Sequence, residues 1–166
     1  IQRDIKKFKK KKQPSWYYEQ QLLGYNYRIT DIQAALGVSQ LKKLDLFTKK
    51  RNSIYKIYKK KFQNYEIKFQ RVEKYNYSSF HLVIVLFKNQ KIRNKVFNFL
   101  RKRKYFVNLH YIPIYRQPFY RKFNFNYSDY PNCEDYYNRA LSIPVYYGLK
   151  MREIKRFIAQ IEECLG

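Results

Sequence analysis

A long run of helical periodicity is the feature that most limits how this chain can fold. Apolar side chains recur three or four residues apart from Ile29 to about Phe62, and this spacing places them on one face of an α-helix. Thr30 and Gln33 have the spacing of a capping box, and Asp31 in the first turn favours the helix dipole. The pattern therefore predicts one helix of about thirty residues. Such a helix is longer than most in globular proteins and suits a segment that links two domains.

Downstream of Asn64 the periodicity becomes mixed. Three segments have strand character, because they alternate loosely or form a near-continuous apolar run: 65–72, 80–87 and 105–110. Three helices and one short extended piece are also expected: from Asn89, over about 131–140 and 151–165, and at 143–145. The order of these elements predicts a small α+β domain with a three-stranded sheet.

Two further segments are expected to be loops. Residues 1–29 are basic and aromatic, and Gln13-Pro14-Ser15 would interrupt any helix there. Residues 111–132 hold three of the five prolines and many aromatic side chains. Because long loops inside a compact domain are usually functional, the second loop is a candidate part of a site.

The net charge of +24 by itself suggests a nucleic-acid partner or an anionic surface. Composition offers a competing explanation: Lys, Asn, Ile, Phe and Tyr, whose codons are rich in A and T, make up half of the 166 residues. Lysine is also twice as frequent as arginine, although arginine reads phosphate and guanine better. A basic nucleic-acid-binding module is therefore the alternative hypothesis, and nucleic acid is not the expected partner.

Other classes of protein are disfavoured by simple features of the sequence. The longest apolar run, Leu82–Phe87, is far too short to span a bilayer, so no membrane segment is expected. No apolar stretch follows the Lys6–Lys12 run as in a signal peptide, and a cytoplasmic location is expected. Cys133 and Cys164 lack CxxC spacing, and neither His81 nor His110 has neighbouring ligands, so no metal site is expected.

Several blocks of the sequence resemble the DegT/StrS family of sugar aminotransferases. The first block is Trp16–Glu19 followed by Leu23–Gly37. Shorter blocks follow in the same order over nearly the whole chain: Gln40-Leu41, Leu44-Asp45, Lys50-Arg51, His81-Leu82, His110–Tyr115, Gln117-Pro118, Tyr130–Asn132 and Leu141–Pro144. The first block together with His110–Tyr115 is most similar to the branch that makes a pseudaminic-acid precursor, a UDP-4-amino-4,6-dideoxy-N-acetyl-altrosamine.

This resemblance implies a fold type I enzyme that works as a homodimer with pyridoxal 5'-phosphate (PLP). A lysine of the large domain would hold PLP as a Schiff base. Glutamate would donate the amino group, and a keto group of a UDP-linked deoxy sugar would accept it. The chain would then comprise a loop segment of the large domain carrying an active-site motif (1–29), a long linking helix (30–64) and the small C-terminal α+β domain (65–166).

The resemblance also assigns roles to four residues. Asn26 would reach across the dimer to the PLP phosphate, for which an amide donor is suitable, and Arg28 would bind an anion. The alternatives are a turn residue for Asn26 and a solvated loop charge for Arg28. His110 and Tyr111 would border the substrate cavity, and the alternative for His110 is a core histidine.

In this family the Schiff-base lysine lies in a Ser-Phe-His-x-x-Lys segment, which this sequence does not contain. Ser79-Phe80-His81 is followed by Ile84 where that lysine would stand, and Ile1–Asp4 resembles the stretch shortly after it. We therefore expect the chain to begin beyond the catalytic lysine, to hold no catalytic residue of its own and to be inactive alone. A non-catalytic remnant that survives as an oligomerisation partner is a further alternative.

Three departures from the family pattern fall on helix caps and turns. Lys150 stands where a capping Thr or Ser is expected, and Lys104 stands where Gly usually precedes the third strand. Phe123-Asn124 replaces a small loop residue.

Overall fold

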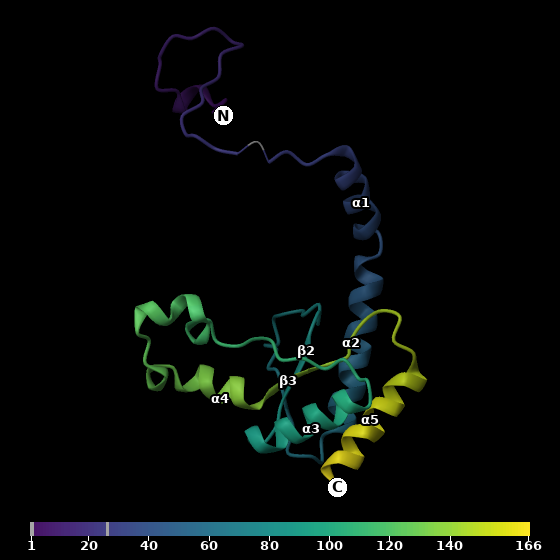
Figure 1. Ribbon diagram of the computed structural model, residues 1–166. Helices are drawn as coiled ribbons and strands as arrows, with labels where there is room; N and C mark the ends of the chain where they lie inside the picture. Colours follow the sequence, from purple (N-terminus) through teal and green to yellow (C-terminus); the bar gives the residue numbers. More distant parts are fainter. Residues whose placement is uncertain (1, 26) are drawn as a thin grey trace. The chain divides into compact units, whose positions relative to one another are not determined.

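The computed structural model of this protein describes residues 2–25 and 27–166, in two units (Figure 1). The first unit is Ile1–Leu41 and the second is Lys42–Gly166. The predicted role of Asn26 falls on a residue outside the described part of the chain.

The first unit contains the short 3₁₀ helix η1 (Ile5–Lys7) and the helix α1 (Asp31–Leu41). The predicted capping box at the start of α1 is confirmed. The Thr30 N–H donates to Gln33 Oε1 at 2.9 Å, and the Gln33 N–H donates to Thr30 Oγ1 at 3.3 Å. These two bonds satisfy backbone donors that have no partner within the helix.

The predicted single helix is interrupted. The helix α1 ends at Leu41, Lys42 and Lys43 form a turn, and α2 runs from Leu44 to Lys61. Within α1 no residue is buried, so packing does not compensate for the weak helix propensity of Gly37 and Ser39. A new helix start is favoured at α2, where Asp45 lies in the first turn and the Phe47 N–H bonds the Lys43 carbonyl at 3.0 Å.

The second unit is built on a three-stranded antiparallel sheet of order β1-β2-β3, so the predicted α+β class is confirmed. The strands are β1 (Lys68–Phe69), β2 (Val83–Leu86) and β3 (Ala140–Ile143). Between β2 and β3 the register pairs Val83 with Ile143 and Leu86 with Ala140. All four β3 residues are buried although β3 is an edge strand, because α3 packs against it and Asn108 forms a bridge with Ser142.

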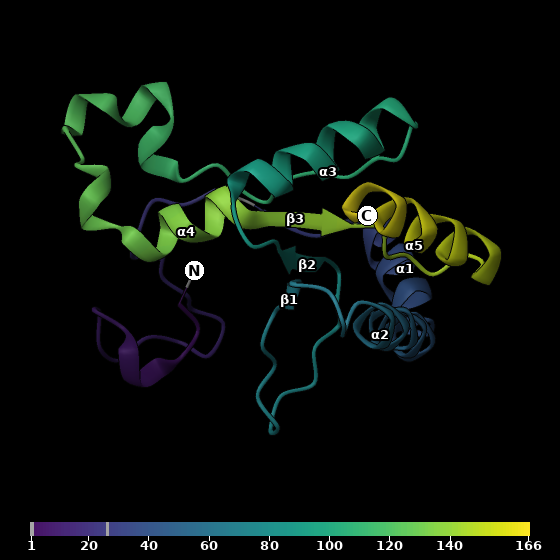
Figure 2. The ribbon, with the colours of Figure 1, turned by 90° about the horizontal axis from the view of Figure 1, so that it is seen from below.

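Helices cover this sheet and complete its core. The helix α3 (Gln90–Lys102) lies against β3, and α5 (Met151–Leu165) packs against both α2 and α3 (Figure 2). The largest fully buried side chains come from all of these elements: Tyr58, Phe62, Phe87, Ile54, Leu100, Leu141, Ile154 and Ile161. The predicted cap of α3 is confirmed, because Asn89 Oδ1 accepts from the Ile92 N–H at 3.0 Å.

The third predicted strand, 105–110, was wrong. Only one isolated bridge forms there, between Asn108 and Ser142, and the third strand of the sheet is β3. The helix expected over 131–140 is α4 (Pro131–Arg139), and the chain enters β3 directly after it. The position of this strand is therefore determined by its pairing with β2 and by the burial of Leu141 and Ile143. Neither of these tertiary contacts can be inferred from the local sequence pattern.

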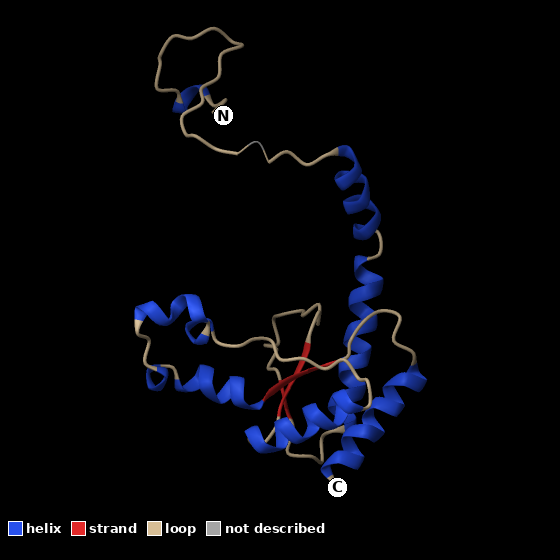
Figure 3. Cartoon of the chain, in the orientation of Figure 1, coloured by secondary structure: helices blue, strands red, loops and turns tan. Residues whose placement is uncertain are grey.

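The segment 111–130 is ordered by three short 3₁₀ helices: η2 (Ile114–Arg116), η3 (Pro118–Phe123) and η4 (Tyr127–Asp129) (Figure 3). Two of the departures from the family pattern have unusual backbone geometry. Lys104 and Asn124 both have φ in the left-handed region, at 62° and 51°. Within the described residues, no helix is long and apolar enough to cross a membrane.

Candidate functional site

Arg28 lies in an exposed, aromatic part of the first unit. It is exposed itself, and it follows Tyr25 and Tyr27, whose rings stack at a centroid distance of 5.1 Å while both stay more than four-fifths exposed. Apolar side chains before and after it are exposed as well: Trp16, Leu22, Leu23, Ile29, Ile32 and Leu36. An arginine in this setting can bind an anion, because its guanidinium forms no ion pair within the described residues.

Glu19 organises the chain that precedes Arg28. It ends the Trp16–Glu19 block, but the sequence predicted no role for it. Its carboxylate accepts from the backbone N–H groups of Lys9 and Lys10, both at 2.8 Å, and from Gln21 Nε2 at 2.6 Å. Chiefly through the Gln21 bond, these donors lower the pKa of Glu19 to about 2. A single buried carboxylate therefore folds the Lys6–Lys12 run back onto the Trp16–Glu19 block, and its role is structural.

His110 and Tyr111 lie in the second unit, next to β3. His110 is half-buried, with Nδ1 at 2.7 Å from Ser142 Oγ, and its backbone carbonyl accepts from the Tyr136 hydroxyl at 2.8 Å. Tyr111 is exposed, and its ring meets the imidazole edge-on at 4.7 Å. These two consecutive residues therefore differ in setting: Tyr111 is exposed and can contact a ligand, whereas His110 is held by Ser142 of β3 and Tyr136 of α4.

An ion pair attaches the 111–130 segment to α4. Both Arg116 Nε and the Tyr115 hydroxyl donate to Glu134 Oε1, at 3.0 and 2.8 Å, and Arg116 Nη2 bonds Oε2. The guanidinium also lies over the rings of Tyr127 and Tyr137, at 4.7 and 4.9 Å. The Arg116 bond holds the pKa of Glu134 below its usual value, while burial, followed by the bond to Glu134, raises the pKa of Tyr115 to about 12.

This cluster was missed by sequence reasoning. Its partners stand 18 and 19 residues apart, on a loop and on a helix, so no local spacing relates them. The cluster fixes the loop that begins at His110 and Tyr111, and it therefore supports the geometry of the candidate site.

All 24 lysines lie within the described residues, and each is exposed apart from Lys50, which is partly exposed. An amine that forms a Schiff base at neutral pH needs a desolvated or cation-flanked site that disfavours its protonated form. No lysine in this part of the molecule is desolvated. The residues present therefore do not fit the covalent attachment of an aldehyde cofactor.

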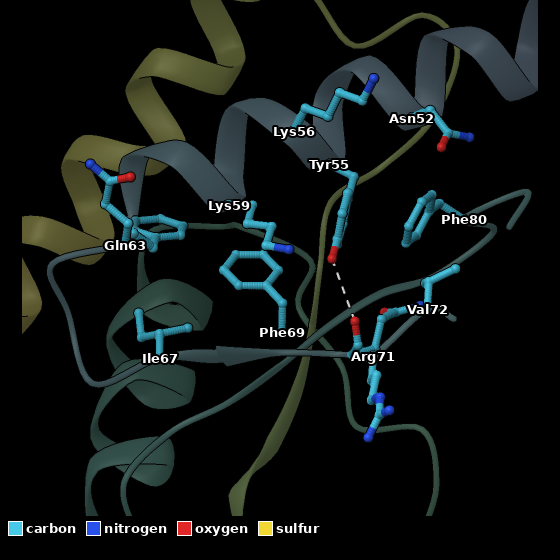
Figure 4. Close-up of a pocket in the computed structure, with 12 residues that line it drawn as sticks. Asn52, Tyr55, Lys56, Lys59, Gln63, Ile67, Phe69, Arg71, Val72 and Phe80 are labelled. Atoms are coloured by element: carbon cyan, nitrogen blue, oxygen red, sulfur yellow. Dashed lines mark hydrogen bonds between the residues drawn. The ribbon is translucent and has the colours of Figure 1, made fainter. Parts of the chain in front are cut away.

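A groove of about 600 Å³ lies between α2 and the segment 67–80 (Figure 4). Tyr55 stacks on Phe80 at 4.0 Å on one side and meets Phe69 edge-on at 5.6 Å on the other. Lys56 and Lys59 of α2 also line the groove, and Lys59 reaches toward Phe69, with its Nζ 6.0 Å from the centre of the Tyr55 ring. The groove contains none of the four predicted site residues, and its lining offers surfaces for binding but no paired acid and base for catalysis.

Three of the four predicted residues lie in the described part of the chain, and they belong to different units. Arg28 belongs to the first, and His110 and Tyr111 belong to the second. In neither part of the described chain do three or more His, Cys, Asp or Glu side chains form a group that could hold a metal ion.

Comparison with known proteins identifies relatives over nearly the whole chain. The model of the DegT/DnrJ/EryC1/StrS aminotransferase family matches residues 3–162. An uncharacterized protein of Methanocaldococcus jannaschii, MJ1066, is 39% identical over 80% of this chain and 36% of its own length. A UDP-4-amino-4,6-dideoxy-N-acetyl-beta-L-altrosamine transaminase of Campylobacter jejuni is 36% identical over 80% of this chain and 36% of its own length.

A solved structure has the same fold. Helicobacter pylori PseC, described as an aminotransferase involved in the biosynthesis of pseudoaminic acid, superposes with a TM-score of 0.78 at 27% identity. That superposition covers 92% of this chain and 42% of PseC. The chain therefore spans well under half the length of the relatives it matches.

Proposed function

This chain belongs to the DegT/DnrJ/EryC1/StrS aminotransferase family, and from that premise we propose that it supplies the C-terminal part of a nucleotide-sugar aminotransferase. The complete enzyme transfers an amino group from glutamate to a keto group of a UDP-linked deoxy sugar. One observation carries this proposal: the family match covers residues 3–162 of the 166-residue chain.

The substrate class follows from the named relatives. The Campylobacter jejuni transaminase named for UDP-4-amino-4,6-dideoxy-N-acetyl-beta-L-altrosamine is 36% identical to this chain over 138 residues, and PseC has the same fold. A UDP-linked 4-keto-6-deoxy amino sugar is therefore the proposed acceptor, with its aminated product used to build a surface glycan. A homodimer is the proposed working assembly.

The cofactor of this family is pyridoxal phosphate, which acts as an electron sink when bound. In the proposed enzyme, Asn26 of this chain would reach across the dimer to hold the cofactor's phosphate, and Arg28 would bind an anionic group of the cofactor. His110 and Tyr111 orient the sugar, because Tyr111 is exposed beside an imidazole that Ser142 and Tyr136 hold in place.

The Schiff-base lysine is proposed to come from residues other than these 166. Two observations support this part of the proposal. The sequence contains no Ser-Phe-His-x-x-Lys segment, and every lysine is exposed or partly exposed. Water stabilises the ammonium form of such side chains and so suppresses their nucleophilicity at neutral pH.

The test compares this chain alone with the same chain produced together with the remaining portion of its enzyme. Each sample is mixed with PLP, its aldimine absorbance is recorded, and borohydride reduction is followed by mapping of the modified lysine. The chain alone should show neither a stoichiometric aldimine nor glutamate-dependent turnover. The combined sample should show both, with the label outside these 166 residues.

Two outcomes would overturn the proposal. Stoichiometric labelling of one lysine in this chain, with turnover of glutamate, would place the catalytic centre here. A combined sample that assembles but forms no aldimine would instead identify the chain as a non-catalytic oligomerisation partner.

A further inference from the structure

The hydroxyl of Ser142 has an unusually constrained environment. Ser142 lies in β3 and is only 6% exposed, and its Oγ is 2.7 Å from Nδ1 of His110. Among the described residues this contact is the one hydrogen bond of that hydroxyl. The backbones are also joined, since the Ser142 N–H donates to the Asn108 carbonyl at 2.8 Å and the Asn108 N–H donates back at 3.4 Å.

These facts decide which of the two groups donates. If Nδ1 carried the proton and donated to Oγ, the buried hydroxyl hydrogen would have no acceptor among the described residues. A buried donor without a partner is costly, whereas an oxygen with a spare lone pair is tolerated more readily. The hydroxyl therefore donates to Nδ1, and the proton of the neutral imidazole must lie on Nε2.

Nε2 is accessible from outside the protein. No hydrogen bond within the described part of the chain engages it, and no side-chain nitrogen or oxygen there is both buried and without a partner. The ring is held on more than one side, because the Tyr136 hydroxyl binds the His110 carbonyl and the Tyr111 ring abuts the imidazole. A fixed ring thus presents Nε2 to solvent.

We propose that Ser142 is a positioning residue that holds His110 as the Nε2–H tautomer, so that the imidazole presents a hydrogen-bond donor to an oxygen of the bound sugar nucleotide. The ligand part of this statement rests on the proposed function. A fixed Nε2–H favours an acceptor such as a sugar hydroxyl or phosphoryl oxygen, and it disfavours a role for neutral His110 as the base that removes a proton.

The tautomer can be measured without cofactor or substrate, which separates this inference from the proposed function. The full 166-residue chain, labelled with ¹⁵N in histidine, is studied at about pH 8.5, where an ordinary imidazole is neutral. Ring ¹⁵N shifts distinguish a protonated from a bare nitrogen. They are readable in solution and in sedimented samples, so self-association does not prevent the experiment.

His81 supplies the internal reference, because it is exposed and the only other histidine. In the unmodified chain, the Nε2–H form of His110 should exceed the Nδ1–H form by at least roughly tenfold. Ser142→Thr keeps the hydroxyl and should preserve that ratio. Ser142→Ala should move it to the ratio of His81, with circular dichroism verifying that the variant is folded.

A proton on Nδ1 of His110 in the unmodified chain would overturn the inference, whether or not any variant folds. So would a His110 ratio that Ser142→Ala leaves unchanged. In the assembled enzyme, addition of the UDP-sugar should shift the His110 Nε2 resonance and leave His81 in place. If the Nε2 resonance does not shift while turnover is normal, His110 does not contact the sugar nucleotide. The aminotransferase proposal would be unaffected by that result.

Discussion

The Tyr58 hydroxyl donates a hydrogen bond to the backbone carbonyl of Pro144, 86 residues further along the chain, at 3.0 Å. Tyr58 is fully buried on α2, and its ring packs edge-on against Phe157 of α5. Pro144 directly follows β3. One side chain therefore joins two helices to the end of the strand that carries Ser142.

Tyr58→Phe removes only the hydroxyl and should lower the free energy of unfolding by about 1–2 kcal/mol, because the Pro144 carbonyl loses its donor. Urea unfolding followed by circular dichroism measures the change. Tyr55→Phe on the same helix is the matched control, since its hydroxyl lies 3.4 Å from the Gln70 carbonyl, a poorer bond. An equal decrease in the free energy of unfolding in the two variants would show that the Tyr58 hydrogen bond stabilises the fold no more than the Tyr55 bond does.

The same residue should make stability sensitive to alkaline pH. Burial, with a smaller contribution from Tyr146, raises the pKa of Tyr58 well above its ordinary value near 10. A raised pKa means that the folded state keeps the proton which the unfolded state releases. The contribution of Tyr58 to the free energy of unfolding is therefore complete below about pH 10 and is lost progressively as the pH rises above that value. From about pH 9 to about pH 11, the urea midpoint of the unmodified chain should fall more steeply than that of Tyr58→Phe. Parallel plots of urea midpoint against pH for the two proteins would contradict this prediction.

Lys104 occupies a backbone position that favours glycine. Its φ of 62° lies in the left-handed region, where the Cβ of an L-residue costs about 1–2 kcal/mol. Lys104→Gly should therefore raise the free energy of unfolding by about 1 kcal/mol, after allowance for the greater flexibility of glycine in the unfolded chain. The matched control is Lys95→Gly on the exposed face of α3, which should lower stability by about 1 kcal/mol. Destabilisation by both changes would argue against strain at Lys104.

The N-terminus of α5 has half of a capping box. Glu153 accepts from the Lys150 N–H at 2.8 Å, but a lysine side chain has no acceptor for the Glu153 N–H. Lys150→Ser supplies that acceptor in an extended N-cap residue and should stabilise the fold by about 1 kcal/mol. Lys150→Ala separates the cap from the loss of a positive charge near the helix N-terminus, so the difference between the Ser and Ala variants measures the cap alone. A difference near zero would mean that the hydroxyl does not bond the helix.

Local signals predicted much of this fold. The caps at Thr30 and Asn89 located two helix starts, because capping depends on residues three positions apart. The strand β3 was missed because Ala140–Ile143 follows α4 without a breaker, and only pairing with β2 makes it a strand. For the candidate site, family blocks predicted His110 and Tyr111. Ser142, 32 residues from His110, is related to it only by the tertiary fold.

The exposed apolar side chains of the first unit lead to a final prediction about the isolated chain. Leu23 is 95% exposed, and on α1 both Ile32 and Leu36 are exposed by more than half. Apolar surface of this kind promotes association, so the chain should self-associate as its concentration rises. Light scattering and binding of an apolar-surface dye measure this behaviour. The double variant Ile32→Gln/Leu36→Gln should reduce both signals, because it removes apolar area without opposing the helix.

Ser39→Gln is the control for that double variant, since it changes an exposed α1 residue and removes no apolar surface. It should leave light scattering and dye binding unchanged. A monomeric unmodified chain that binds little dye would mean that these side chains cover one another in solution. That result would weaken the proposal that this chain is part of a larger aminotransferase.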